Sequence, residues 1–161
     1  MQPSTPSNQP APAAVPTRAP RILIADDTPE AVELLEAYLA GTGYETAIAT
    51  DGEETLARVA DWHPDLILLD VMMPKISGFE VCKRLRSNPA TRDIAILMVT
   101  ALDQTSDVER AVEAGTHEFL SKPINKAELL LTDRNLLAAR QKKTELDRAL
   151  DYFDRMQQGH P

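Results

Sequence analysis

Short apolar segments alternate with longer amphipathic segments along this chain from residue 21 onward. Five apolar segments, each four to six residues long, occur at 21–25, 44–49, 65–69, 94–99 and 117–120. That length suits buried strands, and the segments between them place apolar residues at helical spacing. Because each connection between strands carries a helix, we expect a parallel sheet with right-handed crossovers. The pattern therefore predicts a doubly wound α/β fold with five strands and five helices.

Two of the predicted helices have apolar stripes that we expect to face the sheet. In the first helix, Pro29 suits the first turn, and the stripe consists of Ala31, Leu34, Leu35, Tyr38 and Leu39. In the second helix, which follows Asp51, the stripe consists of Leu56, Val59 and Ala60.

Local signals mark the ends of the other three helices. Ser77 and Glu80 have the spacing of a capping box, which begins a helix, and Asn125 with Glu128 forms a related box at the last helix. The fourth helix is expected from about residue 104 to Ala114, because Gly115 is a typical residue at the end of a helix.

The last predicted helix is unusually long. No Gly or Pro occurs over the 33 residues from Lys126 to Gln158, which corresponds to a helix of roughly 50 Å. A heptad pattern runs through Leu129, Thr132, Leu136, Ala139, Lys143, Leu146, Leu150 and Phe153. Packing on the sheet accounts for the apolar positions in the first half of this helix. The second half, beyond about Gln141, needs another partner or frays, because short isolated helices are marginal in water.

The chain is therefore divided into three parts. Residues 1–20 contain six of the twelve prolines and are expected to be a disordered tail. Residues 21–140 form the α/β domain. Residues 141–161 form a helical extension, a candidate coiled coil through which two copies of the chain would form a homodimer.

Composition narrows the class of partner. The formal net charge of −8 argues against direct binding to nucleic acid and favours basic surfaces or cations. The single cysteine, Cys82, lies among apolar residues and is expected to be a buried thiol. Neither an apolar run of the ~20 residues that a membrane span requires nor a secretory signal is visible. We expect a cytoplasmic protein with no membrane partner.

Four of the five predicted strands run into a polar residue. The first is followed by Asp26 and Asp27, the third by Asp70, the fourth by Thr100 and the fifth by Lys122. The carboxyl ends of parallel strands meet at one edge of the sheet, where ligands bind. We therefore expect three carboxylates, a hydroxyl and an ammonium group to converge, although single residues of this kind are often ordinary solvated strand ends.

The chemistry of this set is consistent with phosphoryl transfer. Clustered carboxylates require a cation, and hard oxygen ligands select Mg²⁺, which keeps several waters. A carboxylate can act as a nucleophile and form an aspartyl phosphate. Lys122 and Mg²⁺ would neutralise the phosphoryl charge, and the Thr100 hydroxyl can donate a hydrogen bond to a phosphoryl oxygen.

The ordered set resembles the receiver domain of response regulators in two-component phosphorelays. The resemblance covers about residues 20–140 and rests on Asp26-Asp27, on Asp70-Val-Met-Met-Pro74 with Gly78, on Thr100-Ala101 and on Lys122-Pro123. It implies a flavodoxin-like sheet with strand order 2-1-3-4-5. It also implies a cis Lys122-Pro123 bond.

The resemblance implies a role for each site residue. Asp70 would accept the phosphoryl group from a histidine kinase or phosphotransfer protein. Asp27, Asp70 and the backbone carbonyl of Met72 would ligate Mg²⁺ directly, and Asp26 would do so through water. Lys122 would pair with the phosphoryl group. Thr100 and Phe119 would form the switch.

Other functions fit less well. An aspartate-nucleophile phosphatase usually has a second acid two residues after the nucleophile, and this chain has Met72 there. The chain lacks the glycine motif of a dinucleotide-binding site. It also lacks the phosphate-binding loop of a flavin carrier. The main alternative is a receiver-like binding module that signals without phosphorylation.

The segment beyond residue 140 is short for an output domain. We therefore expect output by contact with a downstream protein through the fourth and fifth helices or the extension. The chain would be no enzyme beyond its own phosphoryl transfer and slow autodephosphorylation. Met72 and Leu102 occupy the positions that the resemblance places beside the hydrolytic water. Because both are apolar, we expect the phosphoryl state to last minutes or more.

Overall fold

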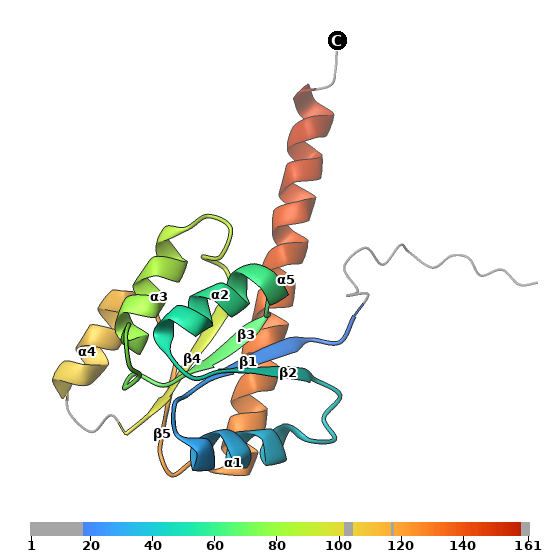
Figure 1. Cartoon of the computed structure of the whole chain (residues 1–161). Coiled ribbons are helices and arrows are strands. Elements are labelled where there is room, and N and C mark those ends of the chain that lie inside the picture. Colours follow the sequence, from blue (N-terminus) through green and yellow to red (C-terminus); the bar gives the residue numbers. More distant parts are fainter. Residues whose placement is uncertain (1–17, 102–104, 117, 159–161) are drawn as a thin grey trace, which may run out of the picture.

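A parallel five-stranded sheet forms the centre of the molecule (Figure 1). The computed structural model describes residues 18–101, 105–116 and 118–158. The sheet has the order β2-β1-β3-β4-β5, and every pair of neighbouring strands is parallel. The strands are β1 (Arg21–Ala25), β2 (Glu45–Ala49), β3 (Leu66–Leu69), β4 (Ala95–Thr100) and β5 (Phe119–Ser121). The doubly wound fold and its strand order are thus confirmed.

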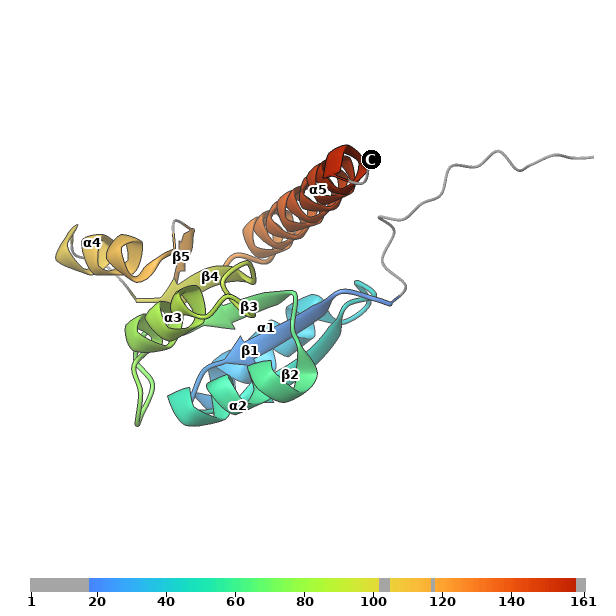
Figure 2. The ribbon, with the colours of Figure 1, turned by 90° about the horizontal axis from the view of Figure 1, so that it is seen from above.

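Five helices connect and cover these strands. They are α1 (Pro29–Leu39), α2 (Gly52–Trp62), α3 (Gly78–Ser87), α4 (Thr105–Ala114) and α5 (Lys126–Gln158). One core cluster joins the sheet to residues of α2, α3 and α4, and a second joins it to α1 and the first half of α5. The two views of the ribbon show this layered arrangement (Figures 1 and 2).

The predicted caps begin their helices. The Ser77 hydroxyl accepts a hydrogen bond from the Glu80 backbone N–H at 3.2 Å. The Asn125 side chain accepts one from Glu128 N–H at 2.9 Å. Gly115 ends α4 with a φ of 109°, a backbone conformation that favours glycine. The Lys122-Pro123 bond is cis, as expected.

The predicted helix stripes are partly wrong. Leu34 of α1 is exposed, whereas Val32, Leu35 and Leu39 are buried. Spacings of three and four residues place these three side chains on one narrow face, and Leu34 lies beside it.

In α2, Ala60 is exposed, and the buried side chains are Thr55 and Val59. Thr55 tolerates burial because its hydroxyl donates a hydrogen bond to the Asp51 carbonyl at 2.8 Å.

Cys82 is fully buried, as predicted, and burial raises the pKa of its thiol to about 11. Among the described residues, none of the helices combines the length and the apolar character that a membrane crossing requires.

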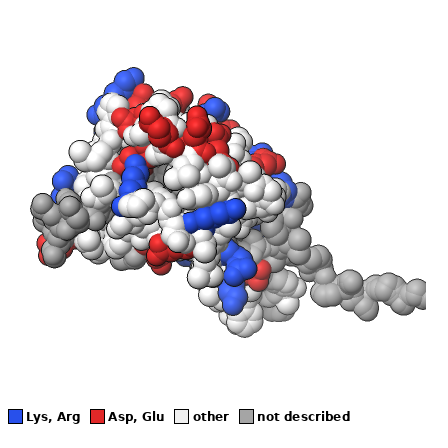
Figure 3. Space-filling view, turned by 90° about the horizontal axis from the view of Figure 1, so that it is seen from below, with Lys and Arg blue, Asp and Glu red and all other residues white. Residues whose placement is uncertain are grey.

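Acidic side chains are unevenly distributed over the surface. Figure 3 shows a group of them along one side of the face seen from below. Helix α1, at the bottom of Figure 1, exposes Glu30, Glu33 and Glu36. Such a surface attracts cations and basic partners more strongly than phosphate-rich ones.

Asp133 is a feature of α5 that the sequence pattern did not reveal. Its side chain is fully buried against the sheet, and neither carboxylate oxygen has a hydrogen-bond partner. Burial raises the pKa of this carboxyl group from 3.8 to about 7. Burial also raises the pKa of Tyr44, with a smaller contribution from Asp133. An acid held in this way opposes the docking of α5 once it ionises.

We predict that Asp133 makes the protein less stable as the pH rises. The unfolded chain loses this proton near pH 3.8, whereas the folded protein keeps it up to about pH 7, so the free energy of unfolding falls between these values. Between about pH 5 and pH 8 the wild type should lose about 1–3 kcal/mol more than Asp133→Asn. Urea unfolding at both pH values measures the difference. Asp154→Asn, an exposed change on the same helix, is the control, and identical pH dependence in all three proteins would contradict the prediction.

Candidate functional site

The carboxyl ends of β1 and β3 bring two aspartates together. The two strands are neighbours in the sheet, so the residues that follow them, Asp26 and Asp70, lie at the same edge. The backbone N–H of Asp70 donates to the Ala25 carbonyl at 2.9 Å, and that of Asp26 donates to the Ala49 carbonyl at 3.0 Å. The hydrogen-bond ladder of the sheet therefore extends to the two acids and fixes their positions.

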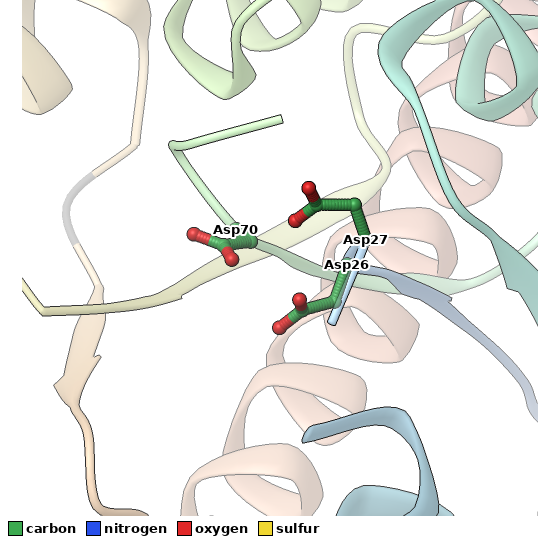
Figure 4. Close-up of side chains that lie close together, drawn as sticks. All are labelled: Asp26, Asp27 and Asp70. Atoms are coloured by element: carbon green, nitrogen blue, oxygen red, sulfur yellow. The ribbon is translucent and has the colours of Figure 1, made fainter. Parts of the chain in front are cut away.

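Asp27 completes a group of three carboxylates (Figure 4). One oxygen of each residue lies within 4.8 Å of the others. Asp26 and Asp70 are only 1% and 5% exposed, whereas Asp27 is exposed. The cluster thus has two buried walls and one side open to solvent, and all three predicted acids are brought together.

Lys122, the residue after β5, supplies a positive charge at this cluster. Its Nζ lies 3.0 Å from Asp26 Oδ2 and 3.2 Å from Asp70 Oδ2. Burial lowers the pKa of this ammonium group, but the two carboxylates outweigh that effect and the net pKa is raised. Lys122 therefore stays charged. Its ammonium group, at the end of β5, forms ion pairs with the carboxylates at the ends of β1 and β3.

Asp26 is the acid most affected by its surroundings. Burial raises its pKa, and the hydrogen bond from the Thr28 backbone N–H and the contact with Lys122 only partly offset that effect. The negative charge of Asp70 raises the pKa further. The cluster is thus under electrostatic stress that a bound cation would relieve.

The loop that follows Asp70 is held by close backbone contacts. The Met72 N–H donates to Asp70 Oδ1 at 3.0 Å. At Gly78, a Cβ atom would lie 2.4 Å from the Asp70 carbonyl oxygen, so only glycine allows this approach. The loop is therefore shaped around Asp70, and the Met72 side chain, 74% exposed, points away from the core.

Sequence reasoning missed the contacts that hold this loop against α2. Gly52 donates its N–H to the Pro74 carbonyl at 3.3 Å, and a Cβ atom there would clash with Ile76. Lys75 has a φ of 70° and lies 3.5 Å from the Asp51 carboxylate. The position of Gly52 directly after the helix-capping Asp51 could have indicated this close approach from the sequence alone. No sequence pattern indicated that Lys75 would pair with Asp51.

The two switch candidates lie on neighbouring strands. Thr100 is the last residue of β4 and is in register with Ser121 of β5. Phe119, at the start of β5, is partly buried against the core cluster of α2, α3 and α4. Ala101, which follows Thr100, is exposed. Leu102, the second predicted water-flanking residue, lies outside the described residues.

The donor set of the cluster fits a small divalent cation. The formal charges of three carboxylates and one ammonium group sum to two negative charges in a partly buried site. The free ligands are oxygens, which Mg²⁺ prefers, and the open side at Asp27 leaves room for the waters that Mg²⁺ retains. A carboxylate nucleophile beside a cation and a lysine is equipped for phosphoryl transfer.

Comparison with known proteins finds relatives in sequence and in fold. Residues 22–132 match the family described as the response regulator receiver domain. The chain is 46% identical over 116 residues to the response regulator PleD of Caulobacter vibrioides, covering 72% of this chain and 26% of PleD. The chain therefore spans about a quarter of that relative.

Two solved structures are also similar. A putative response regulator from Chloroflexus aurantiacus is 39% identical, with a TM-score of 0.72, and the match covers 75% of this chain and 99% of the other. The receiver domain of the sensor histidine kinase PA1611 from Pseudomonas aeruginosa is 27% identical, with a TM-score of 0.69, and the match covers 74% and 98%. That structure has a magnesium ion coordinated in its active-site cleft.

Proposed function

This chain belongs to the response regulator receiver domain family of two-component signalling, and we propose that Asp70 is its phosphoacceptor. The donor is a histidine kinase or a phosphotransfer protein. The observation that carries the proposal is the setting of Asp70. Its buried carboxylate is held by Lys122 on one oxygen and by the Met72 N–H on the other, beside Asp26 and Asp27.

Sheet topology supports the choice of Asp70 over the other two acids. Strand β3 lies between β1 and β4. Asp70 therefore has the carboxylates of the β1 end on one side and the Thr100 strand end on the other. A phosphoryl group on Asp70 would lie between the negative charges that hold a cation and the groups that pair with phosphoryl oxygens.

Mg²⁺ is the proposed cofactor. Asp27, Asp70 and the Met72 carbonyl would ligate it directly, and Asp26 would do so through water. The magnesium ion in the related Pseudomonas receiver supports this assignment. When bound, the ion would neutralise negative charge on the phosphoryl oxygens.

In the transfer step, one Asp70 carboxylate oxygen attacks the phosphorus of a phosphohistidine. A P–O bond forms on Asp70 while the P–N bond breaks, and the imidazole leaves with the electron pair of that bond. Lys122, which pairs with the carboxylates before transfer, would then move its ammonium group towards the added phosphoryl oxygens. This shift changes the charge balance at the ends of β1, β3 and β5 at once.

Output would follow from this change through Thr100 and Phe119, which lie at opposite ends of the paired stretch of β4 and β5. A downstream protein would recognise the altered surface of α4, β5 and α5. The chain would thus act through protein contact and catalyse only its own phosphorylation and slow dephosphorylation. A receiver-like module that binds its partner without phosphate is the alternative that the following experiment separates.

We predict that Asp70→Asn abolishes phosphorylation and leaves the fold intact. The change is nearly isosteric, removes the nucleophile and relieves carboxylate repulsion. Mass spectrometry after treatment with acetyl phosphate and Mg²⁺ should show one added phosphoryl group on the wild type and none on the variant. Asp61→Asn, an exposed change on α2, is the control and should be modified normally.

Two results would contradict this assignment: normal modification of Asp70→Asn, or no modification of the wild type with either acetyl phosphate or a phosphorylated histidine donor. The second result would favour the phosphate-independent module.

We also predict a phosphoryl half-life of minutes or more, controlled partly by Met72. Its exposed side chain lies two residues after the phosphoacceptor and cannot orient a water molecule. Met72→Asn would introduce a polar group there, and one hydrogen bond of about 1.4 kcal/mol in the transition state corresponds to about tenfold faster decay.

The measurement is the loss of phosphorylated protein after donor removal in Mg²⁺. Met156→Asn, the same change far along α5, is the control and should decay like the wild type. A wild-type half-life of seconds, or equal decay of Met72→Asn and wild type, would refute the role of Met72.

A further inference from the structure

The second half of α5 extends beyond the body of the molecule (Figures 1 and 2). Two basic residues connect α5 to the sheet domain before this segment. Arg140 lies 3.0 Å from the Asp65 carboxylate, and Lys143 lies 3.5 Å from that of Asp93. From Glu145 to Gln158, every residue is exposed. About 20 Å of helix is therefore not covered by the described part of the chain.

This exposed segment carries an apolar stripe. Leu146, Leu150 and Phe153 follow one another at spacings of four and three residues and are 58%, 55% and 60% exposed. Such spacing places them on one face of the helix, and Ala149 and Met156 lie at its edge. The opposite face carries Asp151 and Arg155, and Asp147 lies at the other edge of the stripe from Ala149 and Met156. We call Leu146, Leu150 and Phe153 the distal stripe.

The distal stripe is turned to one side of the surface by which α5 meets the sheet domain. At about 100° per residue, its three side chains lie roughly a third of a turn away from Arg140, which marks the side of α5 that faces the sheet. The first half of the heptad pattern packs on the sheet through Leu129. The distal stripe lies beyond the body of the molecule (Figure 1), where its side chains are exposed and a second helix has free access.

We propose that the distal stripe is a dimer interface, and that its occupant is the same segment of a second copy in a parallel, in-register coiled coil. In this arrangement Leu146 and Phe153 occupy d positions and Leu150 an a position, each facing its own counterpart.

Charge complementarity favours a second copy in the parallel orientation. Lys142 occupies a g position and Asp147 the following e position. In a parallel pair, Lys142 of each copy lies beside Asp147 of the other, which is a favourable contact. An antiparallel pair instead brings together the edges that carry Asp147 and Asp154, which repel. Lys143, at an a position, pairs with Asp93 and Asp147 of its own chain, so the interface begins at Leu146.

The same charges disfavour a membrane as the occupant. Residues 141–158 contain four basic and four acidic side chains, so the segment has no net attraction to anionic lipid. Helices that bind membrane surfaces usually have a basic polar face.

The first test compares two neighbouring aromatic residues. Phe153 and Tyr152 are 60% and 58% exposed, but only Phe153 lies on the distal stripe. Sedimentation equilibrium of the full chain, without phosphodonor, should show a monomer–dimer equilibrium for the wild type and for Tyr152→Ala. Phe153→Ala should weaken association at least tenfold. A monomer at every concentration, or equal weakening by both changes, would overturn the proposal.

The second test determines orientation by disulfide formation between copies. Leu146→Cys and Gln157→Cys occupy d and a positions about 16 Å apart along the helix, so both should crosslink in a parallel pair. An antiparallel pair can crosslink at most one of them. Cys82 is buried and its thiol has a pKa of about 11, so it should not compete.

Asp151→Cys, on the opposite face, is the control and should remain uncrosslinked. Crosslinking at only one of the two stripe positions, or as fast at Asp151→Cys as at these positions, would contradict a parallel coiled coil.

Discussion

The repulsion among three carboxylates at one edge of the sheet is the constraint on which the rest of this molecule depends. Asp26, Asp27 and Asp70 approach within 4.8 Å of one another, and two of them are buried. One ammonium group, that of Lys122, offsets part of this charge. Because the formal charges leave two negative charges in a partly buried place, a bound cation would stabilise the site.

The scaffold maintains this unfavourable cluster by fixing the backbone around it. Hydrogen bonds of the sheet continue to Asp26 and Asp70, and Gly78 allows the following loop to pass close to the Asp70 carbonyl. Lys122 lies 52 residues from Asp70 in sequence, yet the order of the strands brings its ammonium group within 3.2 Å. Lys122 therefore links Asp70 to the end of β5, the strand that precedes α5.

Much of this arrangement could be predicted from the sequence because it depends on short-range patterns. Alternating apolar segments determined the strands, and parallel topology then required that Asp70 and Lys122 meet. Features that depend on packing could not be predicted. Leu34 and Ala60 are apolar yet exposed, since small rotations decide which edge of a helix meets the sheet.

Asp133 shows the opposite failure. A polar residue in an amphipathic helix is expected to face water, but Asp133 is buried without a hydrogen-bond partner. The length of α5, in contrast, was correctly predicted, because the absence of Gly and Pro is a local property. The exposure of the distal stripe required the structure, since it depends on where α5 leaves the body of the molecule (Figure 1).

The most direct test of the central claim is calorimetric titration of Mg²⁺ into the wild type, Asp27→Asn and Asp61→Asn. Asp27 is exposed and can be changed without disturbing the core. If residual negative charge at the cluster creates the cation site, the wild type and Asp61→Asn should bind one Mg²⁺ with equal affinity, and Asp27→Asn should bind at least tenfold more weakly. Equal binding by all three proteins, or no binding by the wild type, would contradict this account.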